Sequence, residues 1–253
     1  MATLTVKGRA PKTGYSREQF GQAWFDSDRN GCDTRNDLLR RDLKKRSMKN
    51  SCKVLAGTLT SDPYTAKQVR FVYGGPSEVD IDHVIALSDA WQKGAAKWAP
   101  AKRVQFANDP LNLLAVSAGA NRSKGDGDTA TWLPLNKSFR CAYVARQVAV
   151  KARYGVWVTA AERDAMVRVL SVCPTQKLPT SKAIPLGGGT IVATPSTPTP
   201  TAPASTKPSA RLDPDFGTCR EAIDAGYGPY YEGKDPEYDW YRDADSDGIV
   251  CEP

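Results

Sequence analysis

The chain has 253 residues, of which 40% are hydrophobic and 25% are charged, and its net charge is +7. This length allows one large domain or two modest ones. The only histidine is His83, which excludes every site that needs two or three imidazoles. No run of about eighteen apolar residues occurs, so we expect no membrane-spanning helix.

The charge is distributed unevenly along the chain. Residues 1–178 contain 29 Lys/Arg against 16 Asp/Glu, a net +13, whereas residues 211–253 contain four Lys/Arg against twelve Asp/Glu, a net −8. A basic body with an acidic tail indicates that the body binds a polyanion and that the tail binds cations. A solvated, highly charged surface is an equally good interpretation of the charge alone.

The six cysteines form an even set without any C-x-x-C pair, which argues against structural zinc and for disulfides in an oxidising compartment. The sequence does not fix their connectivity, but a Pro-rich stretch isolates the last two. The N-terminus lacks the apolar segment of a signal peptide, so we expect a mature extracellular chain whose export signal is not part of this sequence. We favour three disulfides: Cys32–Cys52, Cys141–Cys173 and Cys219–Cys251.

Two helices are expected before residue 50. Ser16-Arg17-Glu18-Gln19 has the form of a capping box, which predicts a helix that carries Phe20, Trp24 and Phe25. A second helix is expected to place three leucines on one side and five basic residues around them: Leu38, Leu39, Leu43, Arg40, Arg41, Lys44, Lys45 and Arg46.

Strands and helices alternate irregularly in the rest of the body. Residues 53–60, 68–73 and 79–84 are typical of strands, and a helix is expected around 88–91. A short strand at 112–116 precedes a helical segment that Asn121 is expected to open. Residues 136–153 and 159–172 are predicted to be apolar-faced core helices, the first ended by Gly155 and the second capped at Thr159. The fold class is therefore α+β.

The composition changes abruptly near residue 179. Residues 194–203 consist almost entirely of Pro, Thr and Ser, which cannot bury a core and predict an extended, solvated tether. We therefore expect a domain at 1–178, a disordered linker at 179–215 and a small disulfide-stapled module at 216–253.

A lone histidine such as His83 more often caps a strand or hydrogen-bonds in a core. Together with its neighbour Asp82 and with the asparagines and basic residues of 109–116 and 119–126, however, it indicates phosphodiester hydrolysis. An imidazole can deprotonate water at neutral pH, and a hard divalent cation on oxygen ligands can neutralise a phosphate and assist the leaving oxygen. Adjacent residues of a strand point to opposite faces. We therefore expect a bend or bulge at the strand end that aims both side chains at one phosphate.

Four motifs together resemble the HNH endonucleases of the ββα-metal (His-Me finger) superfamily: Asp82-His83-Val84-Ile85-Ala86-Leu87, Phe106 to Leu114, Asn121 to Asp126, and Trp132-Leu133-Pro134. They are most similar to the secreted nuclease family whose domain is shared with the C-terminal part of GmrSD restriction enzymes. The resemblance covers roughly residues 15–175. It implies a ββα-metal nuclease core with surrounding helices.

The resemblance also implies roles for individual residues. His83 corresponds to the general base, Asp82 to a metal ligand and Asn112 to the asparagine that orients the catalytic loop or the base. Asn121 stands where many relatives have a metal-binding histidine, so the ligands are all oxygen, which favours Mg²⁺ or Mn²⁺, with Ca²⁺ also compatible.

Basic residues provide candidate substrate contacts. We expect either Lys124 or Arg122 to contact the scissile phosphate or an adjacent one. Of the two, Lys124 is the candidate catalytic residue and Arg122 a candidate substrate-binding residue. Arg40 and Arg41 belong to a basic helix that would bind backbone phosphates without reading sequence. Glu78 and Asp80 share the alternation of Asp82, so each is a further candidate for the metal-ligand shell, but we expect both to face solvent.

The C-terminal residues follow the first half of an EF-hand loop, with Gly248 at the sharp turn. Together with Cys219 and Tyr227-Gly228-Pro229, this ending resembles the Excalibur extracellular calcium-binding domain. The expected Ca²⁺ ligands are Asp243, Asp245, Asp247, the carbonyl of Ile249, and Glu252.

These features predict a secreted, monomeric, metal-dependent endonuclease that cleaves DNA with little sequence specificity. RNA is a second candidate substrate. The resemblance implies 5′-phosphate and 3′-hydroxyl products. The alternative is a non-catalytic extracellular protein that binds polyanions and is anchored by its calcium module.

Overall fold

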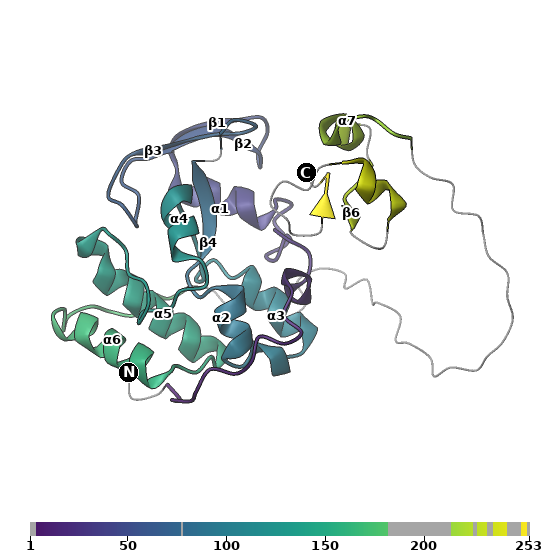
Figure 1. Ribbon diagram of the computed structural model, residues 1–253. Coiled ribbons are helices and arrows are strands. Elements are labelled where there is room, and N and C mark those ends of the chain that lie inside the picture. The colour runs from purple at the N-terminus through teal and green to yellow at the C-terminus, as the bar shows by residue number, and fades with distance from the viewer. Residues whose placement is uncertain are drawn as a thin grey trace, which may run out of the picture. The chain divides into compact units, whose positions relative to one another are not determined.

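The protein is described by a computed structural model over residues 4–76, 78–181, 214–224, 227–231, 235–241 and 249–251 (Figure 1). Two compact units are present, Met1–Ala193 and Thr194–Pro253. The fold is mixed α+β, as expected. Most of the predicted linker and the ligand candidates Asp243, Asp245, Asp247 and Glu252 lie outside the described residues. Within the described part, no helix is long and apolar enough to cross a membrane.

The first predicted helix is wrong. Only a short 3₁₀ helix, η1 (Arg17–Phe20), forms, and the Ser16 side chain makes no capping hydrogen bond. The helix stops at Gly21, whose φ of 81° belongs to the left-handed region and whose position leaves no room for a Cβ beside Val104. Trp24 and Phe25 therefore lie beyond it, outside any helix.

The second predicted helix is shorter than expected. α1 (Thr34–Asp42) is capped by the Asp33 side chain and ends where Leu43 becomes extended. Lys44, Lys45 and Arg46 belong instead to strand β1 (Lys44–Met48), which pairs with β2 (Val54–Leu59) and through it with β3 (Val69–Val72) in an antiparallel sheet. Because β1 is an edge strand, its charged side chains remain exposed and oppose edge-to-edge association.

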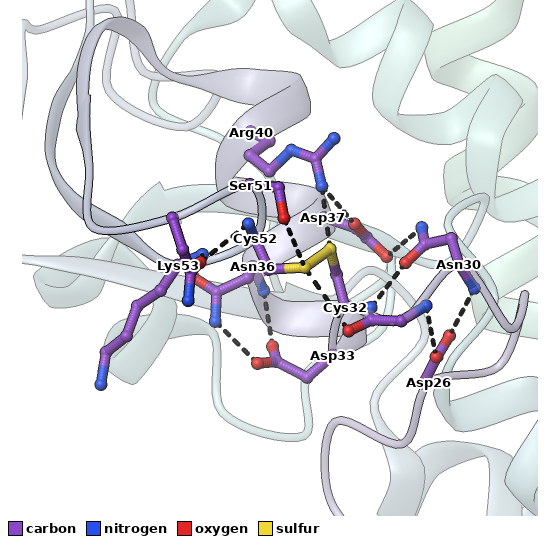
Figure 2. Close-up of a disulfide and its surroundings, with 12 residues drawn as sticks. Asp26, Asn30, Cys32, Asp33, Asn36, Asp37, Arg40, Ser51, Cys52 and Lys53 are labelled. Atoms are coloured by element: carbon purple, nitrogen blue, oxygen red, sulfur yellow. Dashed lines mark hydrogen bonds and ion pairs between the residues drawn. A yellow bond between two sulfur atoms is a disulfide. The ribbon is translucent and has the colours of Figure 1, made fainter.

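Three disulfides are present, with the pairing expected from the sequence. Cys32–Cys52 links the segment before α1 to the β1–β2 turn (Figure 2). In the loop that precedes Cys32, Asp26 accepts hydrogen bonds from the backbone amides of Asn30 and Gly31, at 3.1 and 2.9 Å. These bonds fold the loop so that Cys32 faces Cys52.

A second antiparallel pair consists of β4 (Val79–His83) and β5 (Leu113–Ser117), in register from Val79 opposite Ser117 to His83 opposite Leu113. Between the two strands the chain forms α2 (Leu87–Gln92), η2 (Ala95–Lys97) and α3 (Pro100–Ala107). α4 (Ala118–Lys124) follows β5 directly and lies against β4 (Figure 1). Asn121 is in the middle of α4, not at its start as expected.

The β4–β5 pair is buried on both faces. Ile81 and Leu113 pack on one side with leucines of α1, and Leu114 and Val116 pack on the other with Tyr64 and α5 (Arg140–Tyr154). A short 3₁₀ helix, η3 (Lys137–Phe139), leads into α5, and α6 (Ala160–Ser171) lies against α5. Both long helices confirm the sequence prediction, including the left-handed Gly155 and the Thr159 cap.

The second unit is small and built around a disulfide. Its described elements are α7 (Cys219–Asp224), β6 (Tyr230–Tyr231), η4 (Pro236–Trp240) and β7 (Ile249–Val250), and β6 pairs with β7. Ala222, Tyr230, Val250 and Cys251 form its buried core. The predicted ligand Ile249 thus lies in the strand that pairs with β6.

Candidate active site

A pocket of about 260 Å³ opens at the end of β4. It brings together side chains from η1, β4, α4 and the turns that follow them, including both residues of the Asp82-His83 pair. Its lining consists of Tyr15, Arg17, Ile81, Asp82, His83, Ala86, Leu87, Asn121, Arg122, Gly125 and Asp126. The expected bulge is absent, because the register runs unbroken through His83. Asp82 and His83 leave opposite faces of β4 and still reach one pocket because it lies at the strand end.

The hydrogen bonding of His83 defines which nitrogen is available. Nε2 lies 2.8 Å from the backbone oxygen of Ala107. A carbonyl oxygen only accepts, so Nε2 carries the hydrogen and, in the neutral ring, Nδ1 keeps its lone pair. The ring also stacks on Trp24, with centroids 6.4 Å apart and an interplanar angle of 18°. These two contacts fix both the tautomer and the plane of the imidazole.

The surroundings of His83 keep it neutral. Burial lowers its pKa from 6.5 to about 4, and the positive charge of Arg17 acts in the same direction. The Asp82 carboxylate and the Ala107 carbonyl oppose this shift without cancelling it. At neutral pH the imidazole is therefore unprotonated, which is the form that can accept a proton.

Asp82 lies on the opposite face of β4, with only 6% of its surface exposed. Its Oδ1 accepts a hydrogen bond from Lys124 Nζ at 2.8 Å, and its Oδ2 accepts one from the Tyr64 hydroxyl. Burial and the Asp82 charge raise the pKa of Tyr64 well above its ordinary value, so the hydroxyl remains a donor. Both carboxylate oxygens are thus held in place from inside the protein.

The expected phosphate contact of Lys124 is not possible in this arrangement. Its side chain is completely buried, and Nζ donates to Asp82 and, at 2.8 Å, to the backbone oxygen of His83. Lys124 follows Asn121 by three residues, so both lie on the same face of α4. This face points at β4 and β5, on which α4 packs directly. Lys124 therefore positions the Asp82-His83 pair.

Asn112 also acts on the backbone around His83. Its side-chain oxygen accepts from the Ile85 amide at 2.9 Å, its Nδ2 donates to the Ile85 carbonyl at 3.3 Å, and its own carbonyl accepts from the Val84 amide at 2.7 Å. Asn112 is fully buried and does not line the pocket. It fixes the turn that follows His83 from outside the pocket.

Asn121 and Asp82 fit a hard divalent cation by their chemistry. Nδ2 of Asn121 donates to Asp80 at 3.0 Å, which leaves the amide oxygen for another partner. Asp80 is half-buried and does not simply face solvent as expected, whereas Glu78 is exposed. Mg²⁺ commonly takes one or two protein carboxylates and keeps several waters. The pocket lining supplies one carboxylate and one amide oxygen, which match that requirement.

No larger metal cluster is present in the described part of the chain, where no three His, Cys, Asp or Glu side chains surround a metal position. The spacing Asp26-x-Asp28-x-Asn30-Gly31 repeats that of the C-terminal loop at 243–248. In this N-terminal loop, which lies within the described residues, Asp26 accepts hydrogen bonds from the backbone amides of Asn30 and Gly31, and no three such side chains surround a metal position there.

Two arginines at the pocket provide positive charge. Arg122, expected from the sequence, is exposed and lines the pocket. Arg17 also lines it, and sequence analysis missed this residue because nothing in the predicted first helix placed it near His83. The proximity of Arg17 to His83 is visible only in the fold, where both line the pocket and the charge of Arg17 lowers the pKa of His83.

The two arginines expected to bind DNA on α1 are used within the protein and lie outside the pocket. Arg41 donates to Asp42 and to the backbone oxygens of Pro110 and Leu113, at 2.9 and 2.8 Å. Arg40 contacts Cys32 and Asp37. These bonds join α1 to β5 and to the disulfide.

Residues 30–169 match the family model of the C-terminal domain of GmrSD restriction endonucleases. The chain belongs to this family. The match contains β4, β5 and α4 and therefore His83, Asp82, Asn112 and Asn121. Family membership relates the first unit to nucleases. It also agrees with the resemblance expected from the motifs around His83.

Two further comparisons concern the second unit of this GmrSD C-terminal family member and a secreted relative of the chain. Residues 216–252 match the Excalibur calcium-binding domain, which associates the second unit with Ca²⁺. An uncharacterised secreted protein of Arthroderma benhamiae is 38% identical over 175 residues, which cover 68% of the chain and 82% of the relative. The disulfides fit an extracellular protein as well. No solved structure matches the chain.

Proposed function

We propose that the chain is a metal-dependent endonuclease that hydrolyses DNA phosphodiesters with little sequence specificity, in an extracellular setting. The observation that carries the proposal is the bond between His83 Nε2 and the Ala107 carbonyl, which leaves Nδ1 as a base in a pocket with oxygen ligands and two arginines. RNA shares the same phosphodiester and is included as a substrate. Base-specific recognition is not proposed, since the pocket arginines can bind phosphates without reading sequence.

In this mechanism His83 accepts a proton from the attacking water at Nδ1. The Ala107 carbonyl holds the ring so that this lone pair faces the pocket, and Arg17 and Arg122 bind the phosphate oxygens. Lys124, Tyr64 and Asn112 do not touch the substrate and position Asp82 and His83. The products are a 5′-phosphate and a 3′-hydroxyl.

Asp82 and Asn121 would hold the divalent metal, with Mg²⁺ or Mn²⁺ as the ions that match all-oxygen ligands. When bound, such an ion neutralises charge on the phosphate and assists the leaving oxygen. Lys124 orients the Asp82 carboxylate in the absence of the ion through its hydrogen bond to Oδ1. The buried Tyr64 hydroxyl holds the other carboxylate oxygen.

The test is digestion of supercoiled plasmid in Mg²⁺, Mn²⁺, Ca²⁺ or Zn²⁺, with chelator as the negative condition. Nicking and linearisation that require Mg²⁺ or Mn²⁺ support the proposal. Binding of plasmid without cleavage in any metal would instead support a non-catalytic polyanion-binding protein.

Substitution of the proposed ligands should change the metal requirement. Asn121→Ala and Asp82→Asn should each raise the Mg²⁺ concentration for half-maximal cleavage by about 10- to 100-fold, as found for changes around metal ligands. Ser123→Ala, an exposed neighbour on α4, is the matched control. Unchanged metal titrations in both ligand variants would move the site elsewhere.

The C-terminal unit should be separable from the nuclease unit. A chain that ends at Ala193 keeps the Ser181 contacts to Arg153 and every residue of the pocket, so we expect it to fold and to cleave plasmid. Circular dichroism and cleavage on the same preparation test this. A folded but inactive truncation would show that the second unit is part of the enzyme.

The isolated 211–253 fragment should bind calcium. Because a ligand that binds only the folded state stabilises it, Ca²⁺ should raise the melting temperature of the fragment, and Asp245→Ala should remove most of that rise. Mg²⁺ serves as the control ion. An equal melting temperature with and without Ca²⁺ would contradict calcium binding by this unit.

A further inference from the structure

A second and larger pocket lies close to the candidate active site. It has a volume of about 550 Å³, within the range of small-molecule and nucleotide sites. The loop after η1, the start of α1, the β1–β2 turn and β3 form its walls, and we refer to it as the Trp24–Tyr73 pocket. The residues that carry the argument are Trp24, Arg35, Leu39, Lys53, Phe71 and Tyr73.

The Trp24–Tyr73 pocket has an apolar floor and two aromatic walls, each with a cation. Leu39 and Phe71 are buried at its base. Lys53 Nζ lies 3.8 Å from the Tyr73 ring centroid, and the Arg35 guanidinium carbon lies 5.7 Å from the Trp24 ring centroid. Aromatic faces combined with basic side chains are the features by which proteins bind single-stranded nucleic acid, through base stacking and phosphate contacts.

The Tyr73 side chain is largely exposed to solvent and is not part of a hydrophobic core. Its relative exposure is 56%, among the largest of the bulky hydrophobic residues of the described chain. Its ring is held by Lys53 and not by a core. An exposed aromatic ring beside a lysine is available to a planar ligand that carries negative charge.

Trp24 connects this pocket with the catalytic histidine. Its ring lines the Trp24–Tyr73 pocket and also stacks on His83. Its φ of 56° is unusual for a large side chain, and the Trp24 carbonyl accepts a hydrogen bond from the Thr34 amide at 3.1 Å. Strained residues that the surrounding structure holds in place are concentrated at functional sites. A ligand on Trp24 therefore lies next to the residue that activates water.

The rim on the side of Lys53 is fixed covalently. Cys32–Cys52 joins the start of α1 to the residue before Lys53, and Figure 2 shows Asp33, Asn36 and Lys53 around this disulfide. Asn36 accepts from the Val54 amide at 2.9 Å, and Asp33 accepts from the Asn36 amide at 2.7 Å. The pocket is thus formed before any ligand binds, which reduces the entropy cost of binding.

We propose that the Trp24–Tyr73 pocket binds an unpaired nucleobase of the substrate strand, with the base on the aromatic walls and the adjoining phosphates on Lys53 and Arg35. This inference rests on the proposed nuclease function and specifies its substrate. A base inside a duplex is stacked on both faces and is not available to a protein ring unless it is extruded. Single-stranded nucleic acid, or a locally unpaired strand, is therefore the preferred substrate.

The test measures binding separately from cleavage. In the presence of chelator, which stops metal-dependent cleavage and leaves the Trp24–His83 stack intact, a labelled thymidine oligonucleotide is titrated by fluorescence anisotropy, beside an abasic oligonucleotide of equal length and a duplex. Tyr73→Ala should weaken binding of the thymidine strand by about 5- to 100-fold, the effect of removing one stacking ring. Binding of the abasic strand and the duplex should not change with this substitution.

Three matched variants separate the ring from general effects. Tyr73→Phe keeps the ring and should bind as well as Tyr73. Lys53→Gln should weaken binding to all three nucleic acids and reduce its salt dependence. Val172→Ala, which shortens another highly exposed side chain of the same unit, should have no effect.

The outcomes distinguish this inference from the proposed function. If Tyr73→Ala binds the thymidine strand like its parent, the pocket does not hold a base, and the inference is overturned even where plasmid cleavage depends on His83. If wild-type protein cleaves nothing but Tyr73→Ala still loses affinity for the thymidine strand, the nucleobase site stands and the nuclease proposal fails.

Discussion

Replacement of His83 by alanine should lower plasmid cleavage by about 10²- to 10⁴-fold, the contribution of a positioned general base. No other imidazole exists in the chain that could replace it. The substitution removes the Nε2 bond to the Ala107 carbonyl, but β4 is held by its ladder to β5 and by Asn112. We therefore expect the variant to fold and to bind DNA with nearly unchanged affinity.

Initial rates of plasmid nicking and anisotropy with a DNA oligonucleotide, measured on the same preparation, test this expectation. His83→Gln is the informative companion, because its amide can still donate to the Ala107 carbonyl but cannot act as a base at neutral pH. Both variants should be equally inactive. Near-normal cleavage by either would remove His83 from the mechanism.

The parts of this site that the sequence predicted are those that depend on neighbouring residues and local patterns. The strand that ends at His83 follows from alternation of side chains, and the pairing of Cys219 with Cys251 follows from the Pro-rich stretch that isolates them. The two other disulfides are favoured but not determined by the sequence, and the structure has them as favoured. The helices over Arg140–Tyr154 and Ala160–Ser171 have clear caps and apolar faces. Each of these signals lies within a short window of sequence.

The errors arise where tertiary contacts decide the outcome. The chain leaves the helical conformation after Asp42 because β1 pairs with β2, although the basic residues that follow are good helix formers. Arg17 approaches His83 only through the packing of η1 against α2 and α3.

Buried lysines are the clearest case of what sequence could not supply. Lys93, Lys124 and Lys151 are each fully buried against carboxylates, whereas lysine is ordinarily exposed. Lys93 contacts three carboxylates, of Asp89, Asp128 and Glu162, at 2.6 to 2.7 Å. Burial opposes the charge of Lys93, but Asp89 and Glu162 raise its pKa above the ordinary value, so it remains protonated. Nothing in the local sequence distinguishes these lysines from surface ones.

The buried pair between Lys124 and Asp82 yields the second large prediction. Lys124→Met removes the ammonium and leaves the Asp82 carboxylate and the His83 carbonyl without their buried donor. Removal of one partner of a buried ion pair costs about 3–5 kcal/mol, because the remaining charge is uncompensated. Denaturant unfolding in the presence of chelator should therefore show a lower free energy of unfolding by this amount. Lys97→Met, at an exposed position, should change it by no more than about 0.5 kcal/mol.

Added Mg²⁺ then separates a metal ligand from a purely structural carboxylate. If Asp82 binds the ion, Mg²⁺ supplies the positive charge that Lys124→Met removes, and the free energy of unfolding should rise more in this variant than in wild type. Unfolding curves with and without Mg²⁺ measure the difference, and Lys93→Met, whose carboxylates lie outside the pocket, should gain no such increment. Equal Mg²⁺ effects in Lys124→Met and Lys93→Met would show that Asp82 pairs with Lys124 and does not bind the metal. The interaction that holds the carboxylate in place without metal would then be the whole of its role.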